Sequence, residues 1–558
     1  MKLVTVAQMR AIEKEADASG LSYAEMMQNA GRGLAEILHA LGQQQGWDEV
    51  TGLVGPGNNG GDTLVALAWL AEAGWRTHAW LLNRKTGQDE LVARYLSAGG
   101  ELTDSAADHD HEILNAYLNQ SDVLLDGLLG TGIQLPLKKE AARVLEKINT
   151  LLSEIDPPVF VLAVDCPSGV DCDTGGAAAE TIPADLTLAM AAVKQGLLKL
   201  PAFEFVGELG AVDIGLPQNL DSWQALKTEV ADWDRVSALL PERTSASHKG
   251  TFGTAFVVAG SASYTGAALL AGRAAYRIGA GLVTLAVPAP LHAALAGHLP
   301  EATWVLLPHE NGFISEDASD DVLQNLERAT AFLIGPGLGD KPSTRTFIEN
   351  ILPSIKIPLV IDADGLRHLS QNPLSLWERA GVRAREDSPL PRGEGSGVRD
   401  SAGRRTEPVE VVRAADWHKK LFAPAVLTPH PGEMSALTGL SISEIQSNRA
   451  EIASQYAQAW GHVVVLKGAF TVVACPTGRL AIIPVATPAL ARAGTGDVLA
   501  GLIVGLLAQG LEAYDAALAG AFIHAQAGLL AAETLGATAS VLASDVLDAI
   551  AEVLAELE

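Results

Sequence analysis

Apolar and polar positions along the chain follow two periods, one typical of helices and one typical of strands. Residues 7–41 carry apolar side chains at helical spacing and predict two helices. Short β-rich segments then alternate with helical stretches, which is the pattern of a parallel sheet covered by helices on both faces. The strands expected in this series are residues 50–54, 77–82, 122–126, 159–165 and 185–190.

A polar stretch interrupts the pattern at residues 216–245, so we place a domain boundary near residue 225. A second alternating series follows and closes with three apolar helices. Its expected strands are residues 254–259, 282–287, 331–334, 359–362, 425–428, 463–467 and 470–474. The sequence thus predicts an α/β protein of two domains, residues 1–225 and 226–558.

One segment, residues 372–413, does not fit the second series. It is rich in Arg, Pro, Gly and Glu and has no sustained periodicity. This composition favours a solvated, disordered insertion, and the alternative is a functional lid.

The charge balance argues against nucleic acid as a partner. The chain has 66 acidic and 39 basic residues and a net charge of −27, whereas nucleic-acid phosphates are bound by clustered Lys and Arg. The cysteines are Cys166, Cys172 and Cys475, and their spacing predicts no disulfide framework and no zinc site. A reducing compartment fits this cysteine usage.

The apolar tracts do not predict a membrane anchor. Residues 498–511 and 516–532 are each shorter than the roughly 20 residues of a transmembrane helix, so we expect both to be buried helices. The N-terminus reaches Gln8 and Arg10 before an apolar signal-peptide core can form. We therefore expect a soluble cytoplasmic protein with no membrane partner.

A glycine-rich turn formed by Gly494, Thr495, Gly496 and Asp497 leads directly into an apolar helix. The N–H groups at a helix start lack intrahelical partners and carry partial positive charge, so they can bind a phosphate group. Asp497 has two interpretations. It either complements the helix dipole, or it acts as a base on a hydroxyl group that attacks the bound phosphate.

Other polar or glycine-rich loops follow predicted strands of the second series, at residues 335–339, 362–365, 428–433 and 467–471. The carboxyl ends of parallel strands share one edge of a sheet, where open α/β sheets bind ligands. These loops and the turn at Gly494 therefore favour one common site. The chain contains no Gly-x4-Gly-Lys-Ser/Thr sequence, so this site is not a P-loop.

From about residue 240 onward the chain resembles the ribokinase-like superfamily and, within it, the ADP-dependent NAD(P)H-hydrate dehydratases. The matching segments are residues 248–253, 260–261, 264–267, 279–283, 335–339, 428–433, 467–468 and 494–497. The resemblance implies a ribokinase-like α/β/α domain in which ADP supplies a phosphoryl group to the C6 hydroxyl of a hydrated nicotinamide. Elimination of phosphate then restores the dihydronicotinamide and leaves AMP.

The same resemblance implies roles for individual residues. Asp497 would be catalytic and lie at the substrate, and Gly496 would lie at the nucleotide phosphate. The implied AMP-binding turn consists of Lys467, Gly468, Ala469, Phe470 and Thr471, and the implied hydrate pocket includes Ala267, Gly337 and His430. Taken alone, His430 would more often be a structural histidine. ADP is the implied co-substrate, accompanied by Mg²⁺.

A second glycine-rich loop, residues 55–62, lies between the strand at residues 50–54 and a helix expected at residues 64–73. Its members include Asn58, Asn59, Gly60, Gly61 and Asp62. They can supply backbone donors to a phosphate or oxygen ligands to a cation, and the alternative is a loop whose glycines only serve the turn.

Two more loops extend this candidate site. They contain Asp126, Gly130, Thr131 and Gly132 after one strand, and Asp165 and Ser168 after another. Asn59, Asp126 and Ser168 offer only hard oxygen ligands, which suit an alkali or alkaline-earth cation rather than zinc. Asp165 ends an apolar strand, where partial burial suits a general acid or base, and the alternative is a carboxylate that caps the next loop.

Residues 1–215 resemble the NAD(P)H-hydrate epimerases through the segments 7–10, 58–62, 130–132 and 165–169. The resemblance implies a Rossmann-like three-layer α/β/α domain that interconverts the R and S hydrates at C6. It implies K⁺ at Asn59, Asp126 and Ser168, and catalytic Asp165 near the reacting carbon. Residues 58–62 and 130–132 would bind the substrate.

Together the two resemblances predict a bifunctional isomerase and lyase that repairs hydrated NADH and NADPH (NADHX and NADPHX). We also expect a homo-oligomer. One alternative is a vitamin or sugar kinase in the C-terminal half, which would leave a stable phosphorylated product instead of free phosphate. In another, the N-terminal half is a non-catalytic binding module.

Overall fold

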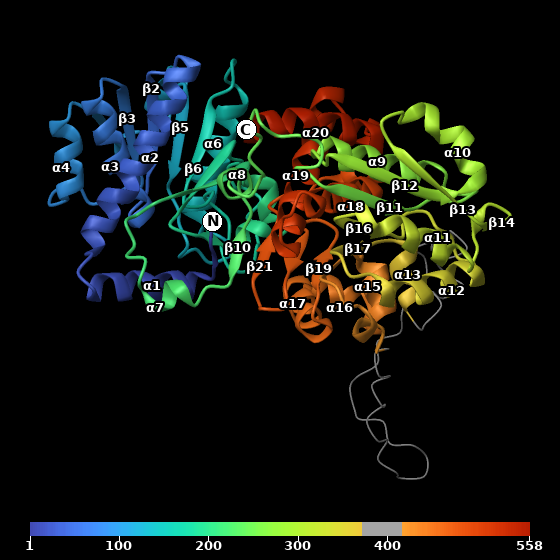
Figure 1. The fold of residues 1–558 in the computed structure, drawn as a ribbon. Helices are drawn as coiled ribbons and strands as arrows, with labels where there is room; N and C mark the ends of the chain where they lie inside the picture. The colour runs from blue at the N-terminus through green and yellow to red at the C-terminus, as the bar shows by residue number, and fades with distance from the viewer. Residues whose placement is uncertain (371–415) are drawn as a thin grey trace, which may run out of the picture. The chain divides into compact units, whose positions relative to one another are not determined.

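The computed structural model describes residues 1–370 and 416–558 (Figure 1). The chain divides into two compact units, unit 1 from Met1 to Asp232 and unit 2 from Trp233 to Glu558. The expected boundary near residue 225 lies in unit 1, between α7 (Asp221–Gln224) and β10 (Thr228–Val230). The predicted insertion at residues 372–413 lies outside the described residues.

Unit 1 begins with the two predicted helices, α1 (Val6–Ala18) and α2 (Tyr23–Gln45). Each starts at a capping box, in which the N-cap hydroxyl and the side chain three residues later satisfy backbone N–H groups reciprocally. The pairs are Thr5 with Gln8 and Ser22 with Glu25. The short strands β1 (Leu3–Val4) and β8 (Val193–Lys194) pair in parallel beside these helices.

The main sheet of unit 1 is parallel throughout, with the strand order β4-β3-β2-β5-β6-β7-β9. Its strands are β2 (Glu49–Val54), β3 (Arg76–Leu81), β4 (Glu101–Asp104), β5 (Val123–Gly127), β6 (Phe160–Val164), β7 (Leu186–Met190) and β9 (Glu208–Val212). Every strand expected in the first series is present. The sequence missed β4 and β9, which lie at the two edges and are half-exposed, so their apolar pattern is weak.

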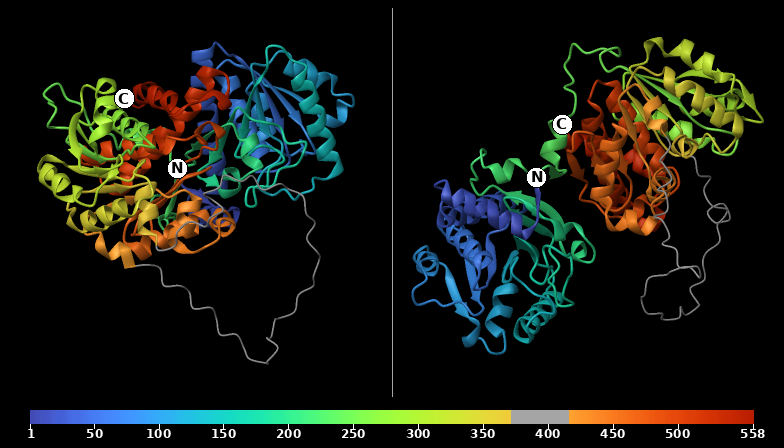
Figure 2. Two further views of the ribbon diagram at one scale, coloured as in Figure 1. Left: turned by 90° about the vertical axis from the view of Figure 1, so that its right-hand side faces the viewer. Right: turned by 90° about the horizontal axis from the view of Figure 1, so that it is seen from below.

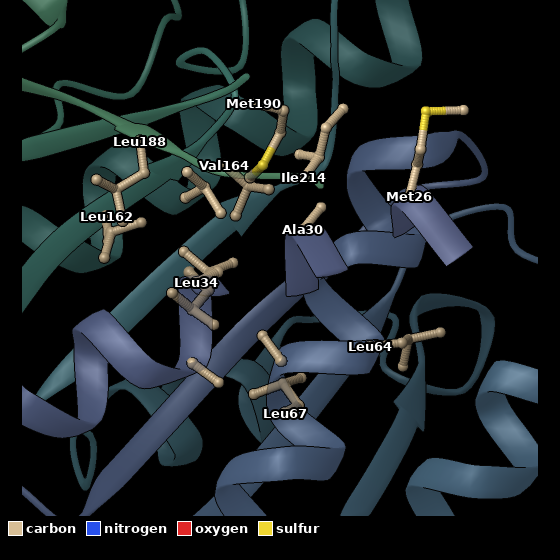
Figure 3. Packing of buried hydrophobic residues seen from close by; sticks show 14 of the residues in the cluster. Met26, Ala30, Leu34, Leu64, Leu67, Leu162, Val164, Leu188, Met190 and Ile214 are labelled. Atoms are coloured by element: carbon tan, nitrogen blue, oxygen red, sulfur yellow. The ribbon is translucent and has the colours of Figure 1, made fainter. Parts of the chain in front are cut away.

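Helices cover both faces of this sheet, as the sequence predicted. Side chains of β5 alternate between the faces, so that Val123 and Leu125 join one apolar cluster and Leu124 joins the other. The first cluster includes residues of α2, α3 (Asn58–Glu72) and α4 (Glu90–Ser97), and Figure 3 shows Leu34 and Leu67 in it. The second includes residues of α5 (Glu112–Leu118) and α6 (Lys139–Ser153).

Unit 2 contains a larger sheet with the strand order β21-β20-β19-β18-β17-β16-β11-β12-β13. These strands are β11 (Thr254–Val258), β12 (Leu282–Pro288), β13 (Thr303–Leu307), β16 (Ala331–Ile334), β17 (Leu359–Ile361), β18 (Ala425–Leu427), β19 (Val463–Leu466), β20 (Val472–Ala474) and β21 (Leu480–Ile482). Pairing is parallel from β13 to β19 and antiparallel from β19 to β21. The expected strands are present, whereas half-exposed β13 and three-residue β21 were missed.

Helices also lie on both faces of the unit 2 sheet (Figure 1). One face carries α9 (Gly266–Arg277), α18 (Thr495–Ala508), α19 (Ala513–Leu535) and α20 (Ala543–Leu557), of which the last three are red in Figure 2. The remaining elements are α8 (Trp233–Ser237), α10 (Ala289–Leu295), α11 (Ala318–Asn325), α12 (Pro342–Ile351), α13 (Asp364–Leu369), α15 (Pro431–Thr438), α16 (Ile442–Ser447), α17 (Arg449–Trp460) and the β14–β15 hairpin (His309–Glu310 and Phe313–Ile314).

The apolar helices α18 and α19 are core elements, in agreement with the sequence analysis. Within the described residues, α19 is long and apolar enough to cross a membrane by length and composition, but 72% of its most apolar window is buried inside the protein. It packs against α18 and α20. Its hydropathy therefore reflects the interior of an α/β sandwich.

The strand order of each sheet indicates the edge at which a ligand can bind. In unit 1, β3 and β4 follow β2 toward one edge of the sheet, and β5 then lies on the other side of β2. In unit 2 the same reversal of strand order occurs between β11 and β16. The loops after such neighbouring strands diverge and leave a crevice at the carboxyl edge of the sheet. The glycine-rich loops singled out from the sequence follow these strands.

Candidate active sites

A cavity of about 920 Å³ opens in unit 1 at the carboxyl ends of β2, β5 and β6. It brings together most of the N-terminal residues singled out from the sequence. Those that line it are Asn58, Asn59, Gly60, Asp62, Gly130, Thr131, Gly132 and Asp165. Gly61 lies on another side of the same turn, where an added Cβ atom would be 2.8 Å from the sulfur of Met27.

The Asn-Asn-Gly-Gly segment forms the first turn of α3, so the helix begins at Asn58 and not at residue 64 as expected. Glycine is required there because the loop folds back on itself: a Cβ atom on Gly60 would lie 2.1 Å from the carbonyl oxygen of Gly55. The close contact between Gly55 and Gly60 lets α3 begin at the edge of the cavity. The N–H groups of its first turn have no intrahelical acceptors. They are available to an anionic group in the cavity.

Asn59, Asp126 and Ser168 converge around the backbone of Leu129. Asp126 accepts hydrogen bonds from the Ser168 N–H at 2.7 Å and the Ser168 hydroxyl at 2.5 Å. The Asn59 amide donates to the carbonyl of Val164 at 2.6 Å and approaches that of Leu129 at 3.5 Å. Ser168 also accepts from the Leu129 N–H at 2.9 Å.

The oxygen atoms of this cluster suit a hard cation. Burial raises the pKa of Asp126, and the hydrogen bonds from Ser168 and Leu128 oppose that shift only in part, so a cation would supply a missing counter-charge. Among residues 1–370 and 416–558, no group of three or more His, Cys, Asp or Glu side chains could hold a metal ion. Binding here would therefore depend on amide, hydroxyl and carbonyl oxygens as well.

Asp165 lies directly after β6 in an unusual conformation that its neighbours hold in place. Its φ angle is 67°, in the left-handed region that non-glycine residues rarely adopt. The Met190 N–H donates to its carboxylate at 2.8 Å, and the ammonium group of Lys194 forms an ion pair with the same oxygen. Lys194 is almost fully buried and also donates to the Met190 carbonyl at 3.0 Å.

Sequence analysis missed several charged residues of this cavity, among them Lys194 and Glu13. Lys194 is a single lysine in the apolar segment from Leu186 to Leu198, and that isolation is the signal that could have found it. Glu13 lies on α1, far from the glycine-rich loops in sequence. Burial raises the pKa of Glu13, and it raises the pKa of Asp62 well above its ordinary value, with the Asp165 charge adding to the shift at Asp62.

In unit 2 the predicted loops meet at the carboxyl edge of the sheet beside the start of α18. Gly494 has a φ angle of 91° and caps α18, so Asp497 lies in the first helical turn. A Cβ atom on Gly496 would lie 3.5 Å from the ammonium nitrogen of Lys467 and 3.9 Å from Oδ2 of Asp362. The glycine turn thus faces a lysine and a carboxylate that come from two different strand ends.

Lys467 is the centre of a buried charge cluster. Its ammonium group lies 2.6 Å from Oδ1 of Asp362 and 3.8 Å from Oε2 of Glu433, and the Thr428 hydroxyl donates to the same Asp362 oxygen at 2.7 Å. Burial alone would lower the pKa of Lys467, but the two carboxylates outweigh this and the net shift is upward. Lys467 is therefore a permanent cation beside the turn.

Asp497 has the electrostatics of a base that titrates near neutrality. Burial, followed by the charge of Asp362, raises its pKa to about 7, although Lys467 opposes the shift. Asp364 also contributes to the rise. Such a value maximises the usefulness of a carboxyl group in proton transfer at neutral pH.

Asp362 also has the properties expected of a divalent-cation ligand. Its Oδ2 atom is buried and has no hydrogen-bond partner among the described residues. Glu433 lies on the same side, within reach of Lys467. Two carboxylates beside a phosphate-binding turn are the hard oxygen set that Mg²⁺ takes together with nucleotide phosphates.

His430 has a structural role as well as its place in the site. Its Nδ1 atom caps α15 by accepting from the N–H groups of Gly432 at 2.9 Å and Glu433 at 3.3 Å. Its Nε2 atom lies 3.3 Å from Oε1 of Glu433. Burial lowers the pKa of His430, so the neutral ring that serves as a cap is favoured.

Gly337 and Ala267 lie against each other, as expected for one pocket. A Cβ atom on Gly337, whose φ angle is 63°, would be 2.7 Å from the Cβ atom of Ala267. The neighbouring Gly339 N–H donates to Asp364 at 2.8 Å, and Arg367 donates to Asp364 at 3.1 Å. Asp364 thereby connects this loop with the strand end that carries Asp362.

The turn at residues 467–471 joins β19 to β20 and leaves backbone exposed at Gly468 and Ala469. It is fixed by hydrogen bonds from the Thr471 hydroxyl to the Gly468 carbonyl at 2.9 Å and from the Phe470 N–H to Val485 at 2.9 Å. Arg449 donates to the Leu466 carbonyl at 2.7 Å, beside this turn, and burial lowers its pKa to about 10. The sequence analysis did not identify Arg449.

Comparison with known proteins places both units in described families. Residues 23–196 match the family described as YjeF-related protein N-terminus. Residues 255–382 and 411–552 match the family described as NAD(P)H-hydrate dehydratase. The second match omits residues 383–410, which lie within the insertion inferred from composition.

Similar proteins cover nearly the whole chain. The bifunctional NAD(P)H-hydrate repair enzyme Nnr of Moorella thermoacetica is 34% identical over 538 residues, which are 95% of this chain and 92% of that protein. The Escherichia coli protein of the same name is 32% identical over 528 residues, which are 93% of this chain and 87% of that protein.

Among solved structures, an ADP/ATP-dependent NAD(P)H-hydrate dehydratase from Bacillus subtilis, co-crystallised with ATP and Mg²⁺, is 31% identical. It matches with a TM-score of 0.46 over 60% of this chain and 100% of that chain. The relatives that span both units decide the assignment: the chain belongs to the family of bifunctional NAD(P)H-hydrate repair enzymes.

Proposed function

We propose that this chain repairs hydrated NADH and NADPH in two steps. Residues 1–225 epimerise the R and S hydrates at C6, and residues 226–558 dehydrate the S hydrate with ADP, releasing AMP and phosphate. The observation that carries this proposal is the similarity to repair enzymes across 95% of the chain, through both sites. The family relationship favours dehydration over the vitamin-kinase and sugar-kinase alternatives.

In the dehydratase step, the start of α18 holds the β-phosphate of ADP. Gly496 leaves room for the phosphate beside Lys467, whose ammonium group offsets the charge that develops during transfer. Asp497 accepts the proton of the C6 hydroxyl as that oxygen attacks the β-phosphorus, and the bond between this phosphorus and the oxygen of the departing AMP breaks. The C–O bond then breaks, phosphate departs, and loss of a ring proton forms the double bond of the dihydronicotinamide.

The nucleotide and the substrate occupy different loops of this site. The exposed backbone of residues 467–471 binds the AMP portion, with Lys467, Gly468, Ala469, Phe470 and Thr471 as the contact residues. Ala267, Gly337 and His430 line the hydrate pocket. Asp362 and Glu433 would hold Mg²⁺, which offsets phosphate charge when it is bound.

In the epimerase step, the unit 1 cavity binds the substrate along residues 58–62 and 130–132, and Asp165 lies at the reacting carbon. Asn59, Asp126 and Ser168 would hold K⁺, which would fix the loops on which Asp165 depends. The convergence of the Asn59, Asp126 and Ser168 side chains around the Leu129 backbone supports this assignment. Cytoplasmic location and a homo-oligomeric state stay predictions from the sequence.

The test supplies a mixture of R and S NADHX with ADP and follows the absorbance of reduced nicotinamide. Recovery of both halves, with one phosphate and one AMP released per NADH, supports the proposal. Recovery of the S half alone would contradict the epimerase assignment. A stable phosphorylated product without free phosphate would establish the kinase alternative.

A further inference from the structure

Two carboxyl groups in the unit 1 cavity have opposite surroundings. Asp62 and Asp165 both line the cavity, on the first turn of α3 and directly after β6. The proposed function gives a catalytic role to Asp165 alone. A reaction that removes and returns a hydroxyl group at one carbon, however, needs both a proton donor and a proton acceptor.

Asp62 is placed to remain protonated. Its residue is 6% exposed, and among the described residues none forms a hydrogen bond or a salt bridge with its carboxyl group. The charged or titratable groups that face it are Glu13 on α1, Arg84 after β3, Asp165 after β6 and Lys194 on β8. Burial raises its pKa most, the two acidic neighbours add to the rise, and the two basic neighbours offset only part of it.

Asp165, in contrast, is held in a buried ion pair. One of its oxygens accepts both the Met190 N–H and the ammonium group of Lys194. Lys194 is 2% exposed as a side chain and its only other contact of this kind among the described residues is the Met190 carbonyl. The other titratable groups near Asp165 are Glu13, Asp62 and the thiol of Cys166.

We propose that Asp62 is the general acid and Asp165 the general base of the epimerisation, with Lys194 as the residue that positions the Asp165 carboxyl group through their ion pair. This inference rests on the epimerase function proposed above. Two carboxyl groups whose environments differ in this way can divide the acid and base roles at one pH.

The chemistry balances without a redox partner. Asp62 gives its proton to the C6 hydroxyl, the C6–O bond breaks with its electron pair on oxygen, and water leaves. The lone pair of the ring nitrogen forms a double bond to C6, which gives a planar iminium ion. A water molecule then adds to the opposite face of C6, the double-bond electrons return to nitrogen, and Asp165 takes the proton that this water releases.

The cycle closes when a proton returns from Asp165 to Asp62 through the cavity. Glu13 also lines the cavity, and it interacts electrostatically with both carboxyl groups. The reverse epimerisation uses the same planar intermediate, with addition to the first face. Each inversion replaces the original hydroxyl oxygen by one from solvent.

The two-unit chain provides its own control for the test. In Asp62→Asn, the rate of R-hydrate use should fall about 10²–10⁴-fold, the usual contribution of a general acid, while unit 2 uses the S hydrate at the wild-type rate. The KM for the R hydrate should change far less than kcat. Asp17→Asn, an exposed substitution on α1, should leave both rates unchanged.

The pH profile separates a catalytic role from a structural one. The wild-type epimerase rate should fall at alkaline pH as Asp62 loses its proton, and Asp62→Asn should lack this descending limb. In Lys194→Met the kcat of epimerisation should fall because Asp165 loses the ion pair that positions it, and Lys194→Arg should restore kcat in part. Epimerisation in water enriched in ¹⁸O should place one solvent oxygen in each inverted product.

Several outcomes would overturn the inference. They are wild-type epimerisation by Asp62→Asn, an unchanged alkaline limb in that variant, retention of the original oxygen, and a complete loss in Glu13→Gln that Asp62→Asn does not show. Failure of the wild-type chain itself to use the R hydrate would instead contradict the epimerase function.

Discussion

The ammonium nitrogen of Lys467 lies 2.6 Å from Oδ1 of Asp362, at the ends of two strands that are separated in the sheet by β18. This ion pair lies beside Gly496, so one cation faces both a buried carboxylate and the helix start that is suited to phosphate. The Lys467 charge also lowers the pKa of Asp497, against the larger effects of burial and of the Asp362 charge. Lys467 therefore links the proposed nucleotide site to the protonation of Asp497, the proposed base.

Replacement of Lys467 by Met should damage the dehydratase in two ways. Loss of the cation should reduce the rate by roughly 10²–10³-fold, the usual effect of removing one electrostatic contact to a developing charge. It should also raise the pKa of Asp497 and move the pH–rate profile to higher pH. The measurement is the rate of S-NADHX dehydration with ADP between pH 6 and pH 9.

Lys356→Met is the matched control, because Lys356 is exposed on unit 2 and lies over the ring of Phe422. It should leave both rate and profile unchanged. A Lys467→Met enzyme that is slower but has the wild-type pH profile would contradict the electrostatic link to Asp497.

The pH–rate profile of the wild-type dehydratase should itself contain a limb set by the titration of Asp497. Because burial and Asp362 raise the pKa of this carboxyl group to about 7, the base is half protonated at neutral pH. The value of kcat/KM for S-NADHX should rise with pH and level off above about pH 8, one unit beyond the pKa. Asp497→Asn should abolish this limb together with most of the activity, and a profile that is flat between pH 5 and pH 8 in the wild type would exclude Asp497 as the base.

Most of the fold could be predicted from the sequence because the central strands are buried on both faces. Residues of β2, β5 and β16 are mostly apolar or small, and the pattern locates them within a residue or two. The edge strands β4, β9 and β13 are half-exposed, so their mixed composition resembles that of a loop.

Only the site residues that belong to local sequence motifs could be predicted from the sequence. Glycine-rich turns at strand ends identified Gly496 and Asp62. Lys194 was missed because the number of residues between Lys194 and Asp165 does not show that their side chains are in contact in the folded protein. The paired role of Lys467 with Asp362 was missed for the same reason, although both residues lie in loops that the sequence analysis had singled out.

Gly130→Ala should disturb the proposed K⁺ site without touching unit 2. An added Cβ atom would lie 2.4 Å from Oδ1 of Asn59, so the Asn59 amide must move away from the Val164 carbonyl. The K⁺ concentration for half-maximal epimerisation should rise about 10–100-fold, as for lost support of metal ligands. Titration with KCl in a background of a larger cation measures this.

The comparison for Gly130→Ala is Gly87→Ala, because an added Cβ atom at Gly87 has no heavy atom within 4 Å. It should keep the wild-type response to K⁺. Equal K⁺ requirements in Gly130→Ala and the wild type would contradict the placement of a cation at Asn59.

His524 should make unit 2 sensitive to acid. It is buried on α19, it hydrogen-bonds to the backbone of Thr495, and burial lowers its pKa to about 4 from an ordinary 6.5. Between these values the unfolded chain binds a proton that the folded chain does not, so this contribution to stability is lost as pH falls. Relative to His524→Phe, the wild type should lose about 2 kcal/mol more of its unfolding free energy between pH 7 and pH 5.

Urea unfolding at the two pH values, followed by loss of dehydratase activity, measures this difference between wild type and His524→Phe. His298→Phe serves as the control, because His298 is exposed in the same unit and should not alter the pH dependence. If the wild type and His524→Phe lose the same stability on acidification, His524 is already able to take up a proton in the folded state. Water or an opposite charge would then lie next to the Gly494 turn. The environment of Asp497 would be more polar, and burial alone would not set the pKa of this residue.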